Sequence, residues 1–222
     1  MNDITKNKLL FIVTGTTRGL GKAIAERVIK LNYVLLEINK SETKRKNSFI
    51  ADLSRPDQVI EILKDLSELI VNKYDKFIVV FISNAATIEP VSIIGFFKFN
   101  EIVSTTNINF TSPIIISNAI GRLKNQSIII NITSGAANTN NEGLSLYSAT
   151  KAGINRFISV TKDEKNKNIL HMCSFDPGLI DTDMQATLRK PNKYFKKSNY
   201  HIRLKADRKL NRPELIANNI IE

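Results

Sequence analysis

The sequence predicts an α/β fold: a doubly wound parallel sheet covered by helices on both faces. Six short runs rich in Val, Ile, Leu and Phe alternate along the chain with longer segments of helical periodicity. The runs are apolar at successive positions, as strands are when a parallel sheet is buried on both faces. Because no shift in composition marks a boundary, residues 1–222 are expected to form one three-layer αβα sandwich.

The expected strands are short, and several end at residues that favour a turn. The first is followed by Gly15, the fourth by Ser83–Ala86 and the sixth by Asp176–Gly178. Gly, Pro and small polar residues at such places stop a strand and turn the chain. The six strands are expected at Leu9–Val13, Tyr33–Ile38, Phe49–Ala51, Phe77–Ile82, Ser127–Ile132 and Ile169–Phe175.

The expected helices follow from apolar spacing and from Pro near their starts. Leu20, Ile24 and Val28 are four residues apart, which places them on one face of a helix. Pro56 and Pro213 each precede a helical pattern, and Pro is favoured in the first helical turn. The helices are expected at Leu20–Leu31, after Pro56, at Ile93–Phe97, at Asn100–Leu123, from Tyr147 to Val160 and after Pro213.

The chain beyond the sixth strand departs from the usual pattern of such sheets. A last C-terminal strand often completes them, but no strand-like run follows the final helix, so that strand is expected to be lacking. From Thr182 to about Tyr200 the chain is rich in Lys without strong periodicity, which predicts a mobile loop that closes over the site. Phe96, Phe97 and Phe99 are expected in the core or in a pocket wall.

The net charge of +11 raises the possibility of a nucleic-acid partner. No helix-turn-helix, zinc-finger or aromatic RNA-binding signature accompanies the charge, so no specific nucleic acid is expected and a nucleic-acid-associated protein stays a minor alternative. Solvated basic loops that attract an anionic cofactor or substrate are the favoured interpretation. The basic residues gather in Lys40–Lys46, Lys162–Lys167 and Arg189–Lys209.

Other classes are disfavoured by what the sequence contains. No apolar run approaches the roughly 20 residues of a membrane span, and Met1–Lys8 has no signal-peptide shape. The single cysteine, Cys173, fits a reducing compartment, so a cytoplasmic location is expected. With only His171 and His201 besides, no metal site is expected.

A glycine-rich turn, Thr14–Gly21, lies between the first strand and the first helix. Gly15, Gly19 and Gly21 follow the spacing Gly-x-x-x-Gly-x-Gly. Glycine there lets the backbone approach a pyrophosphate, which the positive end of the helix dipole also attracts. The turn predicts a dinucleotide site in a Rossmann-type sheet; a tight turn without a ligand is the alternative.

The end of the second strand decides which nicotinamide cofactor is expected. An acidic residue there would accept hydrogen bonds from the ribose and repel a 2′-phosphate, yet Ile38, Asn39 and Lys40 are not acidic. Glu37, one residue earlier, argues the other way. Because Arg18 and Lys40 are cations placed to meet a phosphate, NADPH is favoured over NADH.

Two further segments are expected along the cofactor. Asp52 could accept from the adenine amino group with Leu53 against the ring, although a helix cap or plain turn explains the Asp-Leu-Ser sequence almost as well. The small residues of Asn84–Ala86 close the fourth strand and would let the cofactor lie against the backbone.

Tyr147 and Lys151 indicate the chemistry. On a helix, four residues of separation put both side chains on one face. There the ammonium can lower the pKa of the phenol, which could then exchange a proton near neutral pH. With Ser134 upstream and the glycine turn, the pair predicts a nicotinamide-dependent oxidoreductase acting on carbonyl groups.

In combination and order, these motifs resemble the short-chain dehydrogenase/reductase family over essentially the whole chain. Two segments, Asn131–Ala137 and Asp176–Gln185, resemble its branch of sepiapterin reductases and bacterial benzil reductases. That resemblance implies NADPH-dependent reduction of a small ketone or 1,2-diketone to an alcohol by a homodimer or homotetramer. The chain departs from the family pattern in Asn84–Ala86, which has alanine where glycine is usual, and at Asp176, which is acidic where a small or neutral residue is more common.

The resemblance also implies roles. Tyr147 would donate the proton, Ser134 would hydrogen-bond the carbonyl oxygen, Lys151 would hold the ribose, and Asn109, rather than Asn107, would support a proton-relaying water. The implied cofactor-binding residues are Gly15, Thr17, Arg18, Gly19, Leu20, Gly21, Asn39, Lys40, Asp52, Leu53, Asn84, Ala85, Ala86, Tyr147, Lys151, Pro177, Gly178 and Thr182. A non-catalytic dinucleotide-binding sensor or partner protein that retains the fold is the main alternative.

Overall fold

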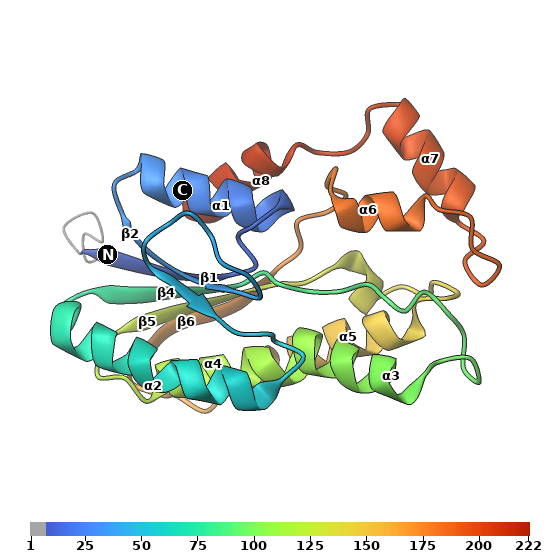
Figure 1. Cartoon of the computed structure of the whole chain (residues 1–222). Coiled ribbons are helices and arrows are strands. Elements are labelled where there is room, and N and C mark those ends of the chain that lie inside the picture. Colours follow the sequence, from blue (N-terminus) through green and yellow to red (C-terminus); the bar gives the residue numbers. More distant parts are fainter. Residues whose placement is uncertain (1–7) are drawn as a thin grey trace.

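The centre of the molecule is a six-stranded parallel sheet with the order β3-β2-β1-β4-β5-β6, shown in Figure 1. This computed structural model describes residues 8–222, so all but the last residue of Met1–Lys8, which was interpreted as lacking a signal-peptide shape, lies outside the described part. The strands are β1 (Leu9–Thr14), β2 (Val34–Asn39), β3 (Ser48–Ile50), β4 (Ile78–Ser83), β5 (Ser127–Ile132) and β6 (Ile169–Phe175). Each expected strand is confirmed to within one residue at either end.

The strand order places β1 in the middle of the sheet. The chain winds outward through β2 and β3, returns to pair β4 with the other edge of β1, and continues outward to β6. In such a sheet the helical connections on one side of β1 cross one face of the sheet, and those on the other side cross the opposite face. This arrangement opens a crevice at the carboxyl ends of the strands. The sheet therefore positions a binding site where β1 and β4 end.

Helices cover both faces, as Figure 1 shows, so the prediction of a three-layer α/β fold is confirmed. The helices α1 and α8 pack together above the sheet in that view, while α2, α4 and α5 lie below it. The helices are α1 (Gly19–Lys30), α2 (Pro56–Lys73), α3 (Phe99–Thr106), α4 (Ser112–Gly121), α5 (Ser145–Thr161), α6 (Asp183–Leu188), α7 (Ser198–Ala206) and α8 (Pro213–Ile221).

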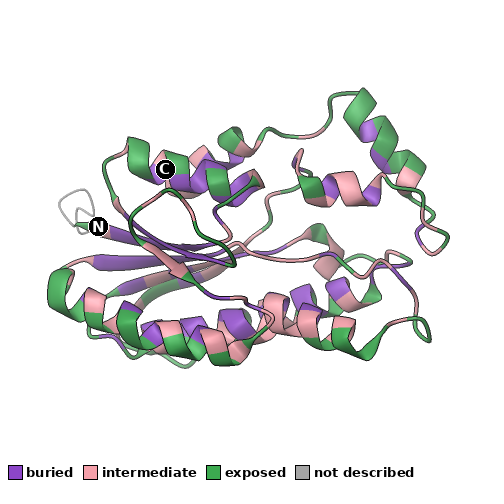
Figure 2. Cartoon of the chain, in the orientation of Figure 1, coloured by how far each residue is buried: buried purple, intermediate pink, exposed green. Residues whose placement is uncertain are grey.

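Two apolar cores lie on the two faces of the sheet, and Figure 2 shows the buried strands between them. Along β1, Leu10 and Ile12 enter the core under α2, α4 and α5, whereas Phe11 and Val13 enter the core under α1 and α8. The alternation is the two-residue period of a strand. Since burial of such a side chain contributes roughly 1.5–3 kcal/mol, both cores hold the sheet in place.

The region before α3 differs from the prediction. No helix forms at Ile93–Phe97, because Gly95 takes a positive φ of 92° that a helix does not contain. Phe96 and Phe99 are 61% and 88% exposed, so their placement in a core or pocket wall was wrong. The expected Asn100–Leu123 helix is two helices, α3 and α4, joined through a π-helical turn.

The segment after β6 also differs from the prediction. Instead of a featureless loop it contains α6 and α7, which Figure 1 shows beyond the end of the sheet. Phe195, between the two helices, is only 2% exposed and packs with Leu188. The Lys-rich composition concealed this small apolar cluster. Within residues 8–222 no strand follows α8, and no helix there is long and apolar enough to cross a membrane.

Candidate active site

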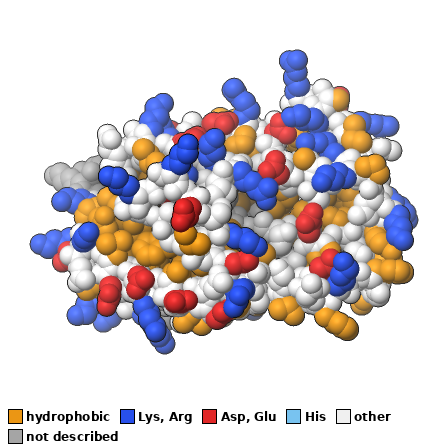
Figure 3. All heavy atoms as spheres, in the orientation of Figure 1, with side chains coloured by type: hydrophobic (Ala, Val, Ile, Leu, Met, Phe, Trp, Pro, Cys, Tyr) orange, Lys and Arg blue, Asp and Glu red, His pale blue; other side chains and the backbone are white. Residues whose placement is uncertain are grey.

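A cavity of about 1150 Å³ lies at the carboxyl ends of the strands. Residues that follow each of the six strands line one side, and α6 and α7 line the other; Figure 3 shows the surface hollowed between these parts. Of the twenty predicted site residues, the lining includes Gly15, Thr17, Arg18, Gly19, Leu20, Asn39, Lys40, Asp52, Leu53, Asn84, Ala85, Ala86, Ser134, Tyr147, Lys151, Pro177, Gly178 and Thr182. Gly21 and Asn109 do not line it.

The glycine turn holds its backbone close to the cavity. Gly15 and Gly19 have positive φ values of 71° and 54°, which favour glycine. A Cβ on Gly21 would lie 2.0 Å from the Gly15 carbonyl oxygen, so Gly21 lets α1 pack against the turn. This close packing is a structural reason for glycine at position 21, and contact of Gly21 with a cofactor stays a prediction. Asn84 secures the same turn, since its amide nitrogen donates to the Thr14 carbonyl oxygen at 3.0 Å.

A buried polar cluster behind the turn was not anticipated. The Glu37 side chain is 1% exposed and accepts from the Arg45 guanidinium at 2.8 Å and from the Thr16 hydroxyl. Asn39 accepts from the Thr16 backbone N–H at 2.8 Å, and Arg45 donates to the Thr16 carbonyl oxygen at 3.0 Å. Glu37 does not line the cavity. The basic run after β2 was the only signal for Arg45, and it does not say which lysine or arginine turns inward.

The two cations expected to meet a phosphate both form ion pairs at the cavity rim. Lys40 Nζ lies 2.7 Å from an Asp52 carboxylate oxygen, and Arg18 lies 3.1 Å from an Asp183 carboxylate oxygen. Partial burial favours protonation of Asp52, but hydrogen bonds from Lys40 and Ser54 outweigh it and lower its pKa. Asp52 is therefore an ionised partner of Lys40 in this structure.

Ser134, Tyr147 and Lys151 meet in the cavity from two elements. Ser134 follows β5, whereas Tyr147 and Lys151 come from the first two turns of α5 and are 4% and 3% exposed. Lys151 Nζ donates to the Ile132 carbonyl oxygen at 2.8 Å and lies 5.9 Å from the centre of the Tyr147 ring. The sheet and the helix thus present a hydroxyl, a phenol and an amine to one space.

Burial sets the proton affinities of this group. It lowers the pKa of Lys151 to about 8, because the charged ammonium is poorly solvated there. It also raises the pKa of Tyr147; the Ser134 side chain opposes this rise and the Asp176 carboxylate adds to it. The expectation that Lys151 lowers the pKa of the phenol is not met in this structure. A phenol that keeps its proton is suited to act as an acid.

Asn109 sits in the π-helical turn Asn107–Thr111, a feature that often marks functional sites. Its side chain spans the Thr87 backbone, accepting from the N–H at 2.9 Å and donating to the carbonyl oxygen at 2.8 Å. It also donates to the Thr150 hydroxyl at 3.1 Å, beside Lys151. Asn109 is therefore next to the site through Thr150, with its side chain engaged in holding the Thr87 loop.

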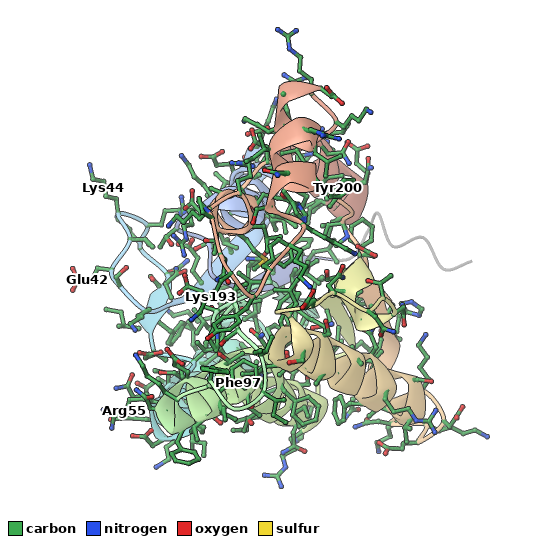
Figure 4. All side chains as sticks on the ribbon, turned by 90° about the vertical axis from the view of Figure 1, so that its right-hand side faces the viewer. Glu42, Lys44, Arg55, Phe97, Lys193 and Tyr200 are labelled. Atoms are coloured by element: carbon green, nitrogen blue, oxygen red, sulfur yellow. The ribbon has the colours of Figure 1, made fainter. Side chains whose placement is uncertain are left out.

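The cap formed by α6, α7 and the chain between them, residues 183–206, supplies lining residues that were missed. Met184 Sδ lies 3.9 Å from Tyr147 Oη, so α6 reaches the phenol. Gln185, Phe195 and His201 also line the cavity. Figure 4 looks at the molecule from this side, with Tyr200 on the upper helices and Phe97 on the lower layer. The described residues contain no group of three or more His, Cys, Asp or Glu placed to hold a metal ion.

Comparisons with known proteins agree with this geometry. The family model for short chain dehydrogenases matches residues 10–193. Benzil reductases ((S)-benzoin forming) of Bacillus subtilis and Bacillus cereus are 28% and 29% identical to this chain. The matches cover 96% and 93% of this chain and 91% and 90% of those proteins.

Solved structures show the same fold. A short-chain dehydrogenase/reductase of Saccharomyces cerevisiae has a TM-score of 0.77 at 22% identity, covering 94% of this chain and 86% of its own. A short chain dehydrogenase of Burkholderia cenocepacia in complex with NADP has a TM-score of 0.72 at 20% identity, covering 96% and 89%. The chain therefore belongs to the short-chain dehydrogenase/reductase family of nicotinamide-dependent oxidoreductases, near its benzil reductases.

Proposed function

We propose that this protein is an NADPH-dependent reductase that converts a small ketone or 1,2-diketone, of the benzil type, to an alcohol. The observation that carries the proposal is the meeting of Ser134, Tyr147 and Lys151 in the cavity that the glycine turn also lines. The similarity to benzil reductases supports the substrate class. A protein that only bound a dinucleotide would have no need of a phenol, a hydroxyl and an amine grouped in this way.

The residues present fit a nicotinamide dinucleotide. The N-terminus of α1 opens on the cavity rim at Arg18 and Gly19, and the side chain of its N-cap residue, Arg18, makes no capping hydrogen bond. Unpaired N–H groups at the start of a 12-residue helix suit a pyrophosphate. Leu53 and Ala85 would flank the adenosine and nicotinamide parts, and Thr182 would meet the carboxamide.

The preference for NADPH rests on the charges near the end of β2. The single acid of that strand, Glu37, is buried against Arg45 and stays outside the cavity, so it is not placed to accept from a ribose hydroxyl. Lys40 and Arg18 do line the cavity, and their ion pairs are at the exposed rim, where exchange for a phosphate costs little. These positions favour the cofactor that carries the extra phosphate.

The mechanism assigns a separate task to each side chain. When bound, the nicotinamide supplies the hydride. The Ser134 hydroxyl donates to the substrate carbonyl oxygen and steadies the negative charge that develops there. Tyr147, held protonated by burial, donates its proton to that oxygen as the alcohol forms. Lys151, anchored on the Ile132 carbonyl, orients the ribose.

The test is a steady-state assay of the purified protein with NADPH or NADH and benzil or 1-phenyl-1,2-propanedione. We expect faster oxidation of NADPH than of NADH. In Tyr147→Phe, turnover should fall about a hundred- to ten-thousandfold, the usual contribution of a general acid, while NADPH binding changes little. Tight NADPH binding without turnover on a panel of diketones and quinones would instead favour a dinucleotide-binding sensor, and equal activity in Tyr147→Phe would refute the mechanism.

A further inference from the structure

Two buried polar side chains interrupt the apolar wall that the cap presents to the cavity. Gln185 of α6 and His201 of α7 are 7% and 8% exposed, and both line the cavity. The apolar residues around them are Met184, Leu188 and Phe195. The other polar residues with which the cap lines the cavity are half-buried or exposed: Asp183, Thr187, Lys197 and Tyr200. In a mostly apolar pocket, a few placed polar groups set the orientation and identity of the ligand.

The hydrogen bond between these side chains determines which atom is free. His201 Nδ1 lies 3.0 Å from Gln185 Oε1, and only the imidazole nitrogen can donate in that contact. Burial and the charges of Lys197 and Arg189 lower the pKa of His201, which keeps the ring neutral with its N–H on Nδ1. The amide nitrogen of Gln185 then has no hydrogen-bond partner among residues 8–222 and is not fully enclosed.

The residue before Gln185 on α6 reaches the reacting end of the cavity. This residue, Met184, places Sδ 3.9 Å from Tyr147 Oη, so this turn of α6 covers the phenol. The oxygen of the reacting carbonyl receives a proton from Tyr147 and a hydrogen bond from Ser134, so these two residues on the opposite wall are already engaged. A second oxygen on the adjacent carbon would face the cap, where a free amide N–H is available.

Resting on the proposed function, we propose that Gln185 is a specificity-determining residue that donates an amide N–H to the second, non-reacting oxygen of a vicinal dicarbonyl. His201 is the positioning residue that fixes the amide in this orientation. The ring of His201 is itself held by Phe195, with ring centres 5.6 Å apart. A site built to hydrogen-bond a substrate oxygen discriminates strongly against an analogue that lacks it, because its donor is then left unpaired.

The experiment compares 1-phenyl-1,2-propanedione with propiophenone, which differs in lacking the second carbonyl oxygen. In Gln185→Met the side chain keeps its length and loses its donor. We expect kcat/KM for the dione to fall about ten- to hundredfold, as loss of a buried hydrogen bond implies. For the monoketone it should change less than about threefold. Leu204→Met, a volume-conserving change at a buried residue of α7 that does not line the cavity, is the control and should leave the ratio of the two substrates unchanged.

Variants at His201 separate positioning from folding. His201→Phe retains an aromatic ring against Phe195 and removes the donor to Gln185. The ratio of kcat/KM for the dione to that for the monoketone should therefore fall, but less than in Gln185→Met. His201→Asn puts an amide N–H near the place of Nδ1 and should restore most of that preference. A purely structural role would lower activity on both substrates together and would not be rescued in this selective way.

Three outcomes decide the proposal. Equal losses on both substrates in Gln185→Met, or no loss on either, would overturn it while leaving the reductase function intact. A wild-type protein that reduces neither substrate would instead refute the proposed function, and the role of Gln185 with it. A readout independent of turnover is calorimetric binding of benzoin to the NADP⁺ complex, which Gln185→Met should weaken about tenfold or more.

Discussion

The two walls of the cavity are held in different ways. The cofactor wall, formed by the glycine turn and the end of β2, is fixed by buried polar contacts, with Glu37 joined to Arg45 and Thr16 joined to Asn39. The cap is held by a small apolar cluster around Phe195 and Leu188. A wall tied to strands by several hydrogen bonds has little freedom, whereas a cap that depends on a few contacts can open at lower cost.

The cap also carries an excess of positive charge. The segment from Arg189 to Arg212 contains ten Lys and Arg residues and a single acid, Asp207, and Figure 3 shows basic side chains gathered over this end of the molecule. Mutual repulsion among these cations works against compact docking of the cap. The ion pair between Arg18 and Asp183, both exposed, is one tie between the cofactor wall and α6.

The largest effect is expected from emptying the apolar cluster of the cap. In Phe195→Ala the free energy that keeps the cap closed should fall by about 3 kcal/mol, as for other buried Phe side chains. Amide hydrogen exchange in α6 and α7 should speed up and KM for a diketone should rise, while the Kd of NADPH stays within about twofold. Phe99→Ala, at a Phe that is 88% exposed, is the control. An equal loss of NADPH binding would show that the two walls are one unit.

Because the pKa of the buried Lys151 is lowered, we expect the stability of the protein to depend on pH. The folded pKa of Lys151 is about 8 against 10.5 for the free side chain, so the unfolded chain binds more protons between these values. The free energy of unfolding should therefore rise from about pH 8 to about pH 10.5, by on the order of 3 kcal/mol. Denaturant titrations should show this rise in the wild type and in the control Lys167→Met. The rise should be absent in Lys151→Met. Parallel curves for all three proteins would contradict burial of the charge.

Removing the cation behind the glycine turn tests the cofactor wall. Arg45→Met leaves the Glu37 carboxylate buried without its partner, which should lower the free energy of unfolding by about 2 kcal/mol and weaken NADPH binding. Adding Glu37→Gln removes the unpaired charge and should recover most of the stability. The Tm of both variants, with calorimetric NADPH binding, checks this. If Arg45→Met alone were as stable as the wild type, the polar cluster around Glu37 would not be what holds the cofactor wall.

The smallest effect is expected at the exposed cations of the rim. Replacing Arg18 and Lys40 by Gln should weaken NADPH about tenfold, or roughly 1.4 kcal/mol, and NADH by less than about twofold. Fluorescence titrations with the two cofactors measure the ratio. Equal losses of affinity for NADPH and NADH would show that Arg18 and Lys40 do not bind the extra phosphate and serve only in their ion pairs with Asp183 and Asp52.

The same contrast explains what could be predicted from the sequence. The strands and the glycine turn were predictable because their signals are local: apolar runs of strand length and glycines at positions of positive φ. The grouping of Ser134, Tyr147 and Lys151 was predictable because helix periodicity and strand order bring them together. The roles expected of these residues in binding and catalysis stay predictions.

The cap was not predictable on those grounds. Its two helices are short, and the deeply buried Phe195 in the chain between them lies among lysines that conceal any apolar period. The inward turn of Arg45 depends on Glu37, eight residues away on β2, and so is a tertiary contact. The hydrogen bonds of the Asn109 side chain to the Thr87 backbone come from its position in a π-helical turn, which a helical sequence pattern does not predict. The role of Asn109 in supporting a proton-relaying water stays a prediction.

The tight approach of Gly21 to the Gly15 carbonyl has a consequence for laboratory evolution. Any substitution at Gly21 adds a Cβ where another atom already lies 2.0 Å away, so a random library loses nearly every member that changes this codon. Met184 and Leu188, on the cap, lie against the open cavity and impose no such limit. Libraries confined to the cap should therefore retain most clones in folded, cofactor-binding form, which makes the cap the place to redirect the enzyme to other carbonyl substrates.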